Sequence, residues 1–387
     1  MFEKIGKRAI VAPLGIALIL CCVFGVALAP MMRAEPTEVP FIVVNEDEGA
    51  VTVMGNNNVG ETLVDNLLSG EGEFLGEDSS DEGDDTNPLG SATITWTQFD
   101  SEDAALEALK GTDYYGALVI PRNFTSQQMN ALVGLSNSPE LKMYLNEGKN
   151  AQMASTMQTM LTANMMAAGI SLDAELVNTA DVGGGTMAPT MMIQMIVMPF
   201  MVMCLICAIF LSLLVWKKDL LGLREKSEMR ALGVQVLIAA VFSAVLAVFA
   251  LLIEVVGGGL TLPFGELFLF LWAAGFCVVC LFMGFCNLMF PLGVLIAVSV
   301  FALGMGTGML GQEMLPAFWA DFIYPWVPQA RIGNGIRDIV YFHTNPYGTE
   351  FVALLITGFI GLVALALAPL ASKASKRKGQ GNGTAQE

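Results

Sequence analysis

The arrangement of apolar and polar segments constrains the fold of this chain most strongly. Residues 9–29 form one 21-residue stretch without a charged side chain, and Lys4, Lys7 and Arg8 precede it. About 155 mostly polar residues follow before further apolar runs begin near Thr190. A helix of about 20 apolar residues crosses a ~30 Å hydrocarbon core, and basic residues beside it stay in the cytoplasm. The polar segment is therefore expected on the outer side of a membrane.

A cleaved signal peptide is the alternative for this region, because Ala27-Leu28-Ala29 resembles a signal-peptidase site. The apolar run is longer than the ~7–15 residues of a signal-peptide core, and Pro30 would follow the cut directly. We therefore predict a cytoplasmic amphipathic segment at residues 1–8 and a first transmembrane helix at residues 9–32.

Five further apolar runs are each close to the ~20 residues that a spanning helix needs. They cover residues 191–216, 232–253, 267–285, 288–310 and 351–370. Cys286-Asn287 and the Pro291–Gly293 break separate the third run from the fourth and predict a tight cytoplasmic hairpin. The composition, 54% hydrophobic and 14% charged, suits such a chain. The prediction is an α-helical polytopic membrane protein with six transmembrane helices, five of them within residues 189–371.

The basic residues test this topology independently, because Lys and Arg concentrate in short cytoplasmic segments. With six spans, 12 of the 19 basic residues lie inside, in short stretches at 4–8, 217–230 and 373–378. Both termini are then cytoplasmic, as are a loop at 217–231 and a tail at 372–387. The expected location is the plasma membrane.

The polar segment at residues 33–188 is strongly acidic, with 25 carboxylates against 5 basic residues. This charge disfavours nucleic-acid binding. The acids are densest within an insertion at 69–90, where self-repelling charge among Gly and Ser residues cannot bury a core. A solvated, disordered insertion is expected there. Divalent-cation binding is the alternative, and no EF-hand spacing supports it.

Strand and helix signals alternate along the rest of this segment. Short β-rich runs lie at 41–44, 93–99, 114–120 and 141–145. Helix starts are indicated by Asn58 with Glu61, by Asp100 or Ser101, and by Thr125 with Gln128. A long Met-rich helix is expected over 150–178. Together these signals predict a small mixed α/β extracytoplasmic domain inserted between the first and second spans.

The chain offers no candidate catalytic or metal-binding group. Cys204-x-x-Cys207 and Cys277-x-x-Cys280 have zinc-like spacing, but they lie inside apolar runs and are expected to be buried small residues. The single histidine, His343, has no paired nucleophile in its neighbourhood. A phosphate-binding Gly-x-x-x-x-Gly-Lys-Ser/Thr loop is missing, and no charged residue lies near the centre of a span. Energy for any transport is therefore expected from another subunit.

A second informative stretch, the loop at 311–349, is too short for a domain and too aromatic for a solvated loop. Its rings suit the membrane–water interface. We expect an outer re-entrant or interfacial helix pair that is broken by prolines. The residues assigned to it are Trp319, Tyr324, Pro325, Trp326, Pro328, Arg331 and Arg337.

Three motifs stand out when the chain is taken as a whole. They are Pro-Phe-Ile-Val-Val-Asn-Glu-Asp-Glu-Gly at 40–49, Gly-Thr-Asp-Tyr-Tyr-Gly-Ala-Leu-Val-Ile-Pro-Arg-Asn-Phe at 111–124, and Pro-Trp-Val-Pro-Gln-Ala-Arg at 325–331 with Arg337. With them the chain resembles permease subunits of type-2 ATP-binding-cassette exporters, including the phage-infection-protein-like (YhgE/Pip) members. Two features of those proteins are missing here, the long coiled-coil stalk of phage-infection proteins and the Gly-Thr of a cytoplasmic Glu-x-Gly-Thr pattern.

The resemblance implies six spans, one outer domain, and a homodimer or a heterodimer with a similar permease. It also implies a cytoplasmic nucleotide-binding subunit that carries ATP and Mg²⁺, with no cofactor on this chain. The connection at 217–230 is the only predicted cytoplasmic one long enough for a docking helix. The residues expected to contact the ATPase are Lys217, Lys218, Leu221, Arg224, Glu225, Lys226 and Glu228.

The expected function is outward movement of a lipophilic or amphipathic substrate, within membrane lipids, by a subunit that is not itself an enzyme. Lipids, lipophilic drugs and peptides suit an apolar path equally. The alternative is a cell-surface receptor or secretion scaffold whose outer domain binds a partner and transports nothing.

Overall fold

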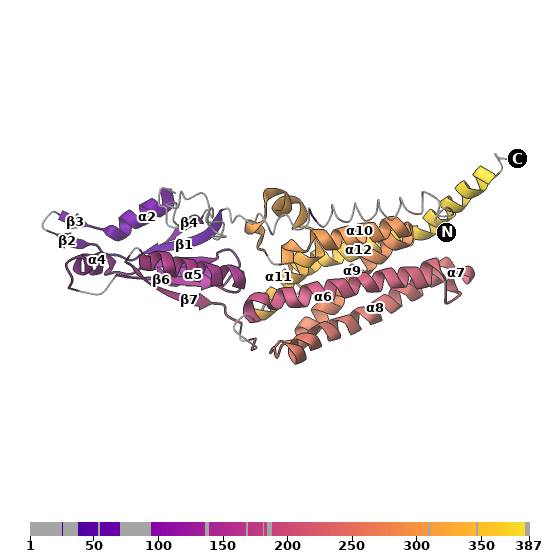
Figure 1. The fold of residues 1–387 in the computed structure, drawn as a ribbon, viewed down its shortest axis with the longest axis horizontal. Helices are drawn as coiled ribbons and strands as arrows, with labels where there is room; N and C mark the ends of the chain where they lie inside the picture. Colours follow the sequence, from indigo (N-terminus) through magenta and orange to yellow (C-terminus); the bar gives the residue numbers. More distant parts are fainter. Residues whose placement is uncertain are drawn as a thin grey trace, which may run out of the picture. The chain divides into compact units, whose positions relative to one another are not determined.

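The structure is a computed structural model, which describes residues 25, 38–52, 55–69, 94–135, 139–167, 169–180, 182–183, 188–308, 310–345 and 347–383. The chain forms two compact units (Figure 1). An α/β unit contains Ala34–Met191 and Val340–His343, and a helical unit includes Met192–Ile339 and Thr344–Glu387. The segment predicted at 1–8 lies outside the described residues, as do the first span apart from residue 25 and the acidic insertion apart from residue 69.

A five-stranded mixed sheet forms the centre of the α/β unit (Figure 1). Its strands, in spatial order, are β4 (Ile94–Phe99), β1 (Val39–Asn45), β5 (Gly116–Ile120), β6 (Glu140–Asn146) and β7 (Ser171–Val177). β1 pairs in parallel with β4 and β5, β5 is antiparallel to β6, and β6 is parallel to β7. Four of these strands lie where the sequence predicts them, so the mixed α/β prediction is confirmed. A small antiparallel pair, β2 (Ala50–Thr52) and β3 (Gly55–Asn57), follows β1.

Helices pack on the sheet because strand residues alternate between its two faces. The helices are α2 (Val59–Ser69), α3 (Glu102–Leu109), α4 (Phe124–Leu132) and α5 (Ala151–Ala167). Ile42 and Val44 of β1 and Tyr144 of β6 form one buried cluster with α3. Their neighbours Leu141 and Met143 are fully buried and point to the opposite face. α5 runs along β6 and β7 (Figure 1).

Two helix starts are confirmed by their side-chain caps. The Oδ1 atom of Asn58 accepts a hydrogen bond from the backbone N–H of Glu61 at 2.9 Å. The hydroxyl of Ser101 accepts one from the N–H of Ala104 at 3.3 Å, so Ser101 rather than Asp100 caps α3. Each bond satisfies an N–H group that the helix itself leaves without a partner.

The long helix expected over 150–178 is wrong in its second half. α5 ends at Ala167, and Ser171–Val177 is instead the edge strand β7. Gly169 has φ of +74°, a left-handed conformation that ends a helix at little cost for glycine. The residues after it alternate polar and apolar, a period of two that suits a half-buried strand.

The capping role expected for Thr125 is also wrong. α4 begins after Asn123, and the Thr125 hydroxyl is buried in a cluster around Asp47. The Asp47 carboxylate accepts hydrogen bonds from the N–H of Gly60 at 3.2 Å, the N–H of Thr125 at 3.1 Å and the Thr125 hydroxyl. The same hydroxyl accepts one from the N–H of Val59 at 2.8 Å. Asp47 therefore ties the loop after β1 to the first turns of α2 and α4.

A second polar cluster joins α3 to β6. The Tyr144 hydroxyl donates to the carboxylate of Glu102, and Lys142 Nζ lies 3.2 Å from the same carboxylate. The hydrogen bond from Tyr144, helped by Lys142, holds the pKa of Glu102 below its usual value despite the opposing effect of burial. Burial and the neighbouring carboxylate together raise the pKa of Tyr144.

The Tyr144→Phe substitution is expected to lower stability in a pH-dependent way. A carboxyl whose pKa is depressed in the folded state stabilises that state above its unfolded pKa, and this contribution is lost as pH falls through the folded-state pKa. Removing the Tyr144 hydroxyl should lower the free energy of unfolding by only about 1 kcal/mol at pH 7, because Glu102 is partly exposed to solvent. The thermal unfolding midpoints of the full-length variant and the wild type should thus differ at pH 7 and converge towards pH 3. Tyr114→Phe, whose ring packs on Phe99, is the control. An equally large gap at both pH values for Tyr144→Phe would contradict this assignment.

The helical unit contains four helices that are long and apolar enough to cross a membrane, counted over the described residues. The candidate spans are Met191–Lys217, Glu228–Gly257, Phe264–Leu288 and Thr349–Lys373, built from α6 (Ala188–Leu211), α8 (Glu228–Leu252), α9 (Phe264–Leu288) and α12 (Thr349–Gly383). α9 is the central helix, since 72% of its most apolar stretch is buried, against 28–44% for the corresponding stretches of the other three candidate spans. It packs against α8, α12 and the shorter α10 (Phe290–Leu303) (Figure 1).

The predicted hairpin between the fourth and fifth spans differs in its details. α9 continues through Cys286 and Asn287 to Leu288, and the break is the single extended residue Met289. α10 has only 14 residues, so the predicted run over 288–310 is a short apolar helix rather than a full-length one. The chain turns at Gly304, where a Cβ atom would lie 2.2 Å from the side chain of Gln329.

The stretch predicted as a helix pair contains one helical segment on each side of Pro325, and a short 3-10 helix, η5 (Gln312–Met314), precedes them. A π-helix, η6 (Trp319–Ile323), precedes α11 (Pro328–Val340). Ile332, Ile336 and Ile339 of α11 are fully buried, as their spacing of three and four residues predicts. Its position relative to a membrane stays a prediction.

Candidate functional site

The connection between α6 and α8 is held in a defined shape by its own polar groups. α6 leads into a π-helix, η2 (Ser212–Lys217), and a short helix, α7 (Leu223–Lys226), precedes α8. The Asp219 carboxylate accepts hydrogen bonds from the N–H groups of Leu223, Arg224 and Glu225 at 2.8–3.0 Å. These bonds, the one from Arg224 first, hold the pKa of Asp219 below its usual value. Asp219 thus caps α7 while its negative charge faces the positive end of the helix dipole.

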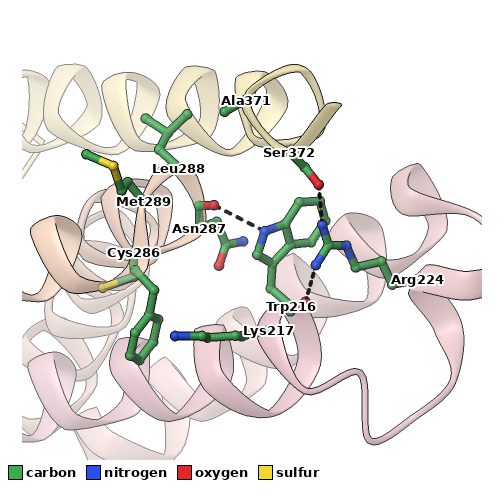
Figure 2. Close-up of a pocket in the computed structure, with 10 residues that line it drawn as sticks. Trp216, Lys217, Arg224, Cys286, Asn287, Leu288, Met289, Ala371 and Ser372 are labelled. Carbon is green, nitrogen blue, oxygen red and sulfur yellow. Dashed lines mark hydrogen bonds between the residues drawn. The ribbon is translucent and has the colours of Figure 1, made fainter. Parts of the chain in front are cut away.

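Arg224 points inward from α7 and joins three elements (Figure 2). Its guanidinium lies over the Trp216 ring, 4.3 Å from the ring centroid. It donates hydrogen bonds to the Trp216 carbonyl oxygen at 2.8 Å and to the Ser372 hydroxyl at 2.6 Å. Glu228 on α8 lies 3.8 Å from the same guanidinium. A planar cation can stack on an indole and donate in its own plane at once, which Lys cannot do.

Trp216 carries this link into the core of the helical unit. Its indole N–H donates to the carbonyl oxygen of Asn287 at 3.1 Å, close to the α9–α10 break (Figure 2). The Asn287 amide in turn donates to Gln235 of α8 at 2.8 Å, and both amides are buried. Neither residue is among those that the sequence singled out for coupling. The signal available was a lone amide within one apolar run, Gln235, and another between the next two runs, Asn287, since a buried amide must find a partner.

The residues expected to contact an ATPase therefore separate into two groups. Arg224 and Glu228 are half-buried and turned towards the helical core. The other five are exposed on the surface. One of them, Leu221, is 54% exposed and lies beside Leu220, which is 66% exposed. The exposed members are Lys217, Lys218, Leu221, Glu225 and Lys226. The outer group offers an apolar and charged surface, and the inner group connects that surface to α9 and α12.

A cavity of about 530 Å³ lies beside this connection. It is lined by Trp216, Lys217, Arg224, Cys286, Asn287, Leu288, Met289, Phe290, Ala371 and Ser372 (Figure 2). These residues come from η2, α7, the α9–α10 break and α12. The Lys217 ammonium group lies 4.4 Å from the centroid of the Phe290 ring.

The second predicted group of residues gathers around α11. Arg331 donates to both carboxylate oxygens of Glu350, at the start of α12, at 3.0 Å. The Tyr324 hydroxyl donates to Asn334, whose amide lies 3.4 Å from Glu350. Arg331 also donates to the carbonyl oxygen of Pro325 at 3.0 Å. This network fixes the turn before α11 to the first turn of α12.

The remaining members of that group lie around the same element. Pro328 begins α11 and is buried, Trp319 begins η6, and Trp326 is 46% exposed. Arg337 lies further along α11 and is half-buried. Glu350, the partner of Arg331, belongs to this network but is not among the residues that the sequence predicted for it. No group of three or more His, Cys, Asp or Glu residues in the described part of the chain could hold a metal ion.

A family model described as ABC-2 family transporter protein matches residues 8–368, which is nearly the whole chain. The comparison with curated proteins gives no match. The match does not single out the phage-infection-protein-like members, and it favours a transport subunit over a receptor. With its apolar spanning helices and this match, the chain belongs to the ABC-2 family of membrane transporter proteins.

Proposed function

We propose that this protein is the membrane permease subunit of an ATP-driven exporter, which moves a lipophilic or amphipathic substrate outward. The energy would come from a separate cytoplasmic nucleotide-binding subunit that holds ATP and Mg²⁺. The observation that carries the proposal is the two-sided connection at 217–230. Leu220 and Leu221 project outward beside charged residues, while Arg224 fastens the same segment to the central helices.

This arrangement supports a mechanical role for Arg224. An ATPase that binds the exposed leucines would move α7, and Arg224 would transmit the displacement to Trp216 and to Ser372 of α12. Trp216 is bonded in turn to the α9–α10 break. A displacement of the surface segment by the ATPase would thereby be transmitted to the central helix α9. Arg224 is a positioning residue in this proposal, because it does not itself face the partner.

The proposed topology has six spans, cytoplasmic termini and the α/β unit outside the plasma membrane. The distribution of basic residues supports this topology, and the short helix α10 would complete its span with the residues that follow it. Apolar side chains along α6 are exposed in the single chain, including Met195, Ile206 and Phe210. They would face lipid or a second permease in a homodimer or heterodimer.

The two-sided connection predicts that binding and coupling can be separated by mutation. The double substitution Leu220→Ser and Leu221→Ser should reduce co-purification of the nucleotide-binding subunit about tenfold, because apolar contact area is lost. Arg224→Gln should leave co-purification intact and lower substrate-stimulated ATP hydrolysis. Val256→Ser, at the other end of the α8 span and 78% exposed, is the matched control. If the leucine variant binds normally, the ATPase contact lies elsewhere.

Labelling of single cysteines should establish the topology. In a chain whose seven cysteines are replaced by alanine, Asp100→Cys and Lys226→Cys each place one thiol at an exposed position. A membrane-impermeant maleimide added to intact cells should modify position 100 and spare position 226 until the cells are opened. The reverse pattern would exclude the proposed orientation.

A further inference from the structure

The cavity beside Arg224 has a lining that the coupling proposal does not use. Its volume, about 530 Å³, falls within the ~300–1,000 Å³ range of small-molecule sites. Two cationic side chains, Lys217 and Arg224, line it, and no carboxylate stands among its lining residues in the described part of the chain. Glu228, outside the lining, lies 3.8 Å from Arg224 and offsets part of its charge, so Lys217 supplies most of the positive charge that would attract an anion.

The two cations keep hydrogen-bonding capacity towards the cavity. Arg224 gives N–H groups to Trp216 and Ser372 and lies 3.8 Å from the Glu228 carboxylate, and a guanidinium has five N–H donors in all. The Lys217 ammonium group lies over the face of Phe290 and donates no hydrogen bond to a residue that the structure describes, so its three N–H donors remain available there. The Ser372 hydroxyl, next to Arg224, adds another donor to the lining. Phosphate oxygens are acceptors that suit such a set of donors.

Apart from the Asn287 amide, the rest of the lining is mostly apolar and continues onto a helix surface. Leu288, Met289 and Phe290 form part of the cavity wall, and Met289 is 56% exposed. Leu292, one turn further along α10, is 44% exposed. A soluble anion would gain nothing from these side chains, whereas an acyl chain would bury them at a gain of about 25 cal/mol per Å².

We propose that this cavity binds the phosphate group of an anionic phospholipid, with Lys217 and Arg224 on the phosphate and α10 along an acyl chain. The lipid would bridge the connection at 217–230 to the α9–α10 break and to α12. The site would therefore exist in the permease alone, whether or not an ATPase is bound. Its test is independent of transport.

The experiment measures thermal unfolding of the full-length protein in mixed micelles. Phosphatidylglycerol should raise the midpoint in a saturable way, and phosphatidylcholine at the same concentration should not. Lys217→Gln should weaken the apparent affinity for phosphatidylglycerol about fivefold, the effect of one basic residue at a lipid surface. Since Lys217 is exposed and forms no ion pair with the residues that the structure describes, this variant should fold normally. Lys218→Gln, which removes the same charge next to the cavity but not from its lining, is the matched control.

Each alternative result would overturn the proposal. Equal shifts with phosphatidylcholine would mean that the site does not recognise the net negative charge of the lipid. Equal losses in Lys217→Gln and Lys218→Gln would mean that general surface charge, rather than this cavity, attracts the lipid. A full shift with inorganic phosphate or glycerol phosphate would identify a soluble anion as the ligand.

Discussion

Replacing Gly361 with valine is expected to prevent α9 and α12 from packing and to leave little monodisperse full-length protein in detergent. A Cβ atom at Gly361 would lie 2.4 Å from the backbone of Cys280 and Leu281. Across the same contact, a Cβ at Gly284 would lie 2.5 Å from the Gly361 carbonyl oxygen. Small residues allow membrane helices to approach closely, and backbone atoms cannot move aside as a flexible side chain can. The substitution should lower the free energy of unfolding by about 3 kcal/mol or more.

Size-exclusion profiles and thermal midpoints would measure this effect. Gly233 in α8 is the matched control, because nothing lies within 4 Å of the position that its Cβ would take. Gly233→Val should therefore give protein of nearly wild-type behaviour. Similar losses for both variants would mean that the α9–α12 contact is not the tight one described.

Replacing Asp47 with alanine should destabilise the α/β unit by about 3 kcal/mol. The substitution leaves the N–H groups of Gly60 and Thr125 without their acceptor, and the Thr125 hydroxyl loses the acceptor of its own proton as well. Buried donors that lose an acceptor lose the hydrogen bond and still lack contact with water. The loop after β1 and the starts of α2 and α4 should open together. Limited proteolysis of the full-length protein should show faster cleavage in this unit.

Glu48→Ala is the control for that experiment, because Glu48 is an exposed carboxylate in the same turn. It should leave the proteolysis rate near that of the wild type. If the two variants are cleaved at the same rate, the turn contributes through its charge and not through the buried hydrogen bonds of Asp47.

The α/β unit shows which kinds of signal can be read locally. Strands β1, β4, β5 and β6 and the caps at Asn58 and Ser101 follow from short patterns, because hydrophobic alternation and capping act over a few residues. The error at β7 arose because apolar and Met residues before Gly169 suggested one continuous helix. Pairing with β6 over seven residues decides the conformation of Ser171–Val177, and no pattern within the segment reveals that partner.

The candidate site shows the same limit. Positive charge beside apolar residues marked the connection at 217–230 as a surface that a partner could bind. The pattern could not say that Arg224 faces inward while Glu225 and Lys226 face outward, since that depends on the Asp219 cap and on the Trp216 ring. The amide pair of Gln235 and Asn287 joins residues 52 positions apart.

The sequence by itself determined the membrane character of the protein, the place of its α/β unit in the chain and most of its secondary structure. These properties follow from length, hydrophobicity and local periodicity, which each segment carries alone. The tertiary structure decided that α9 is the central helix, that α10 is short, and that Arg224 connects the surface segment to α12. Such features depend on close approach between distant segments, as at Gly361 and Cys280, where packing selects one arrangement from many that share the same pattern.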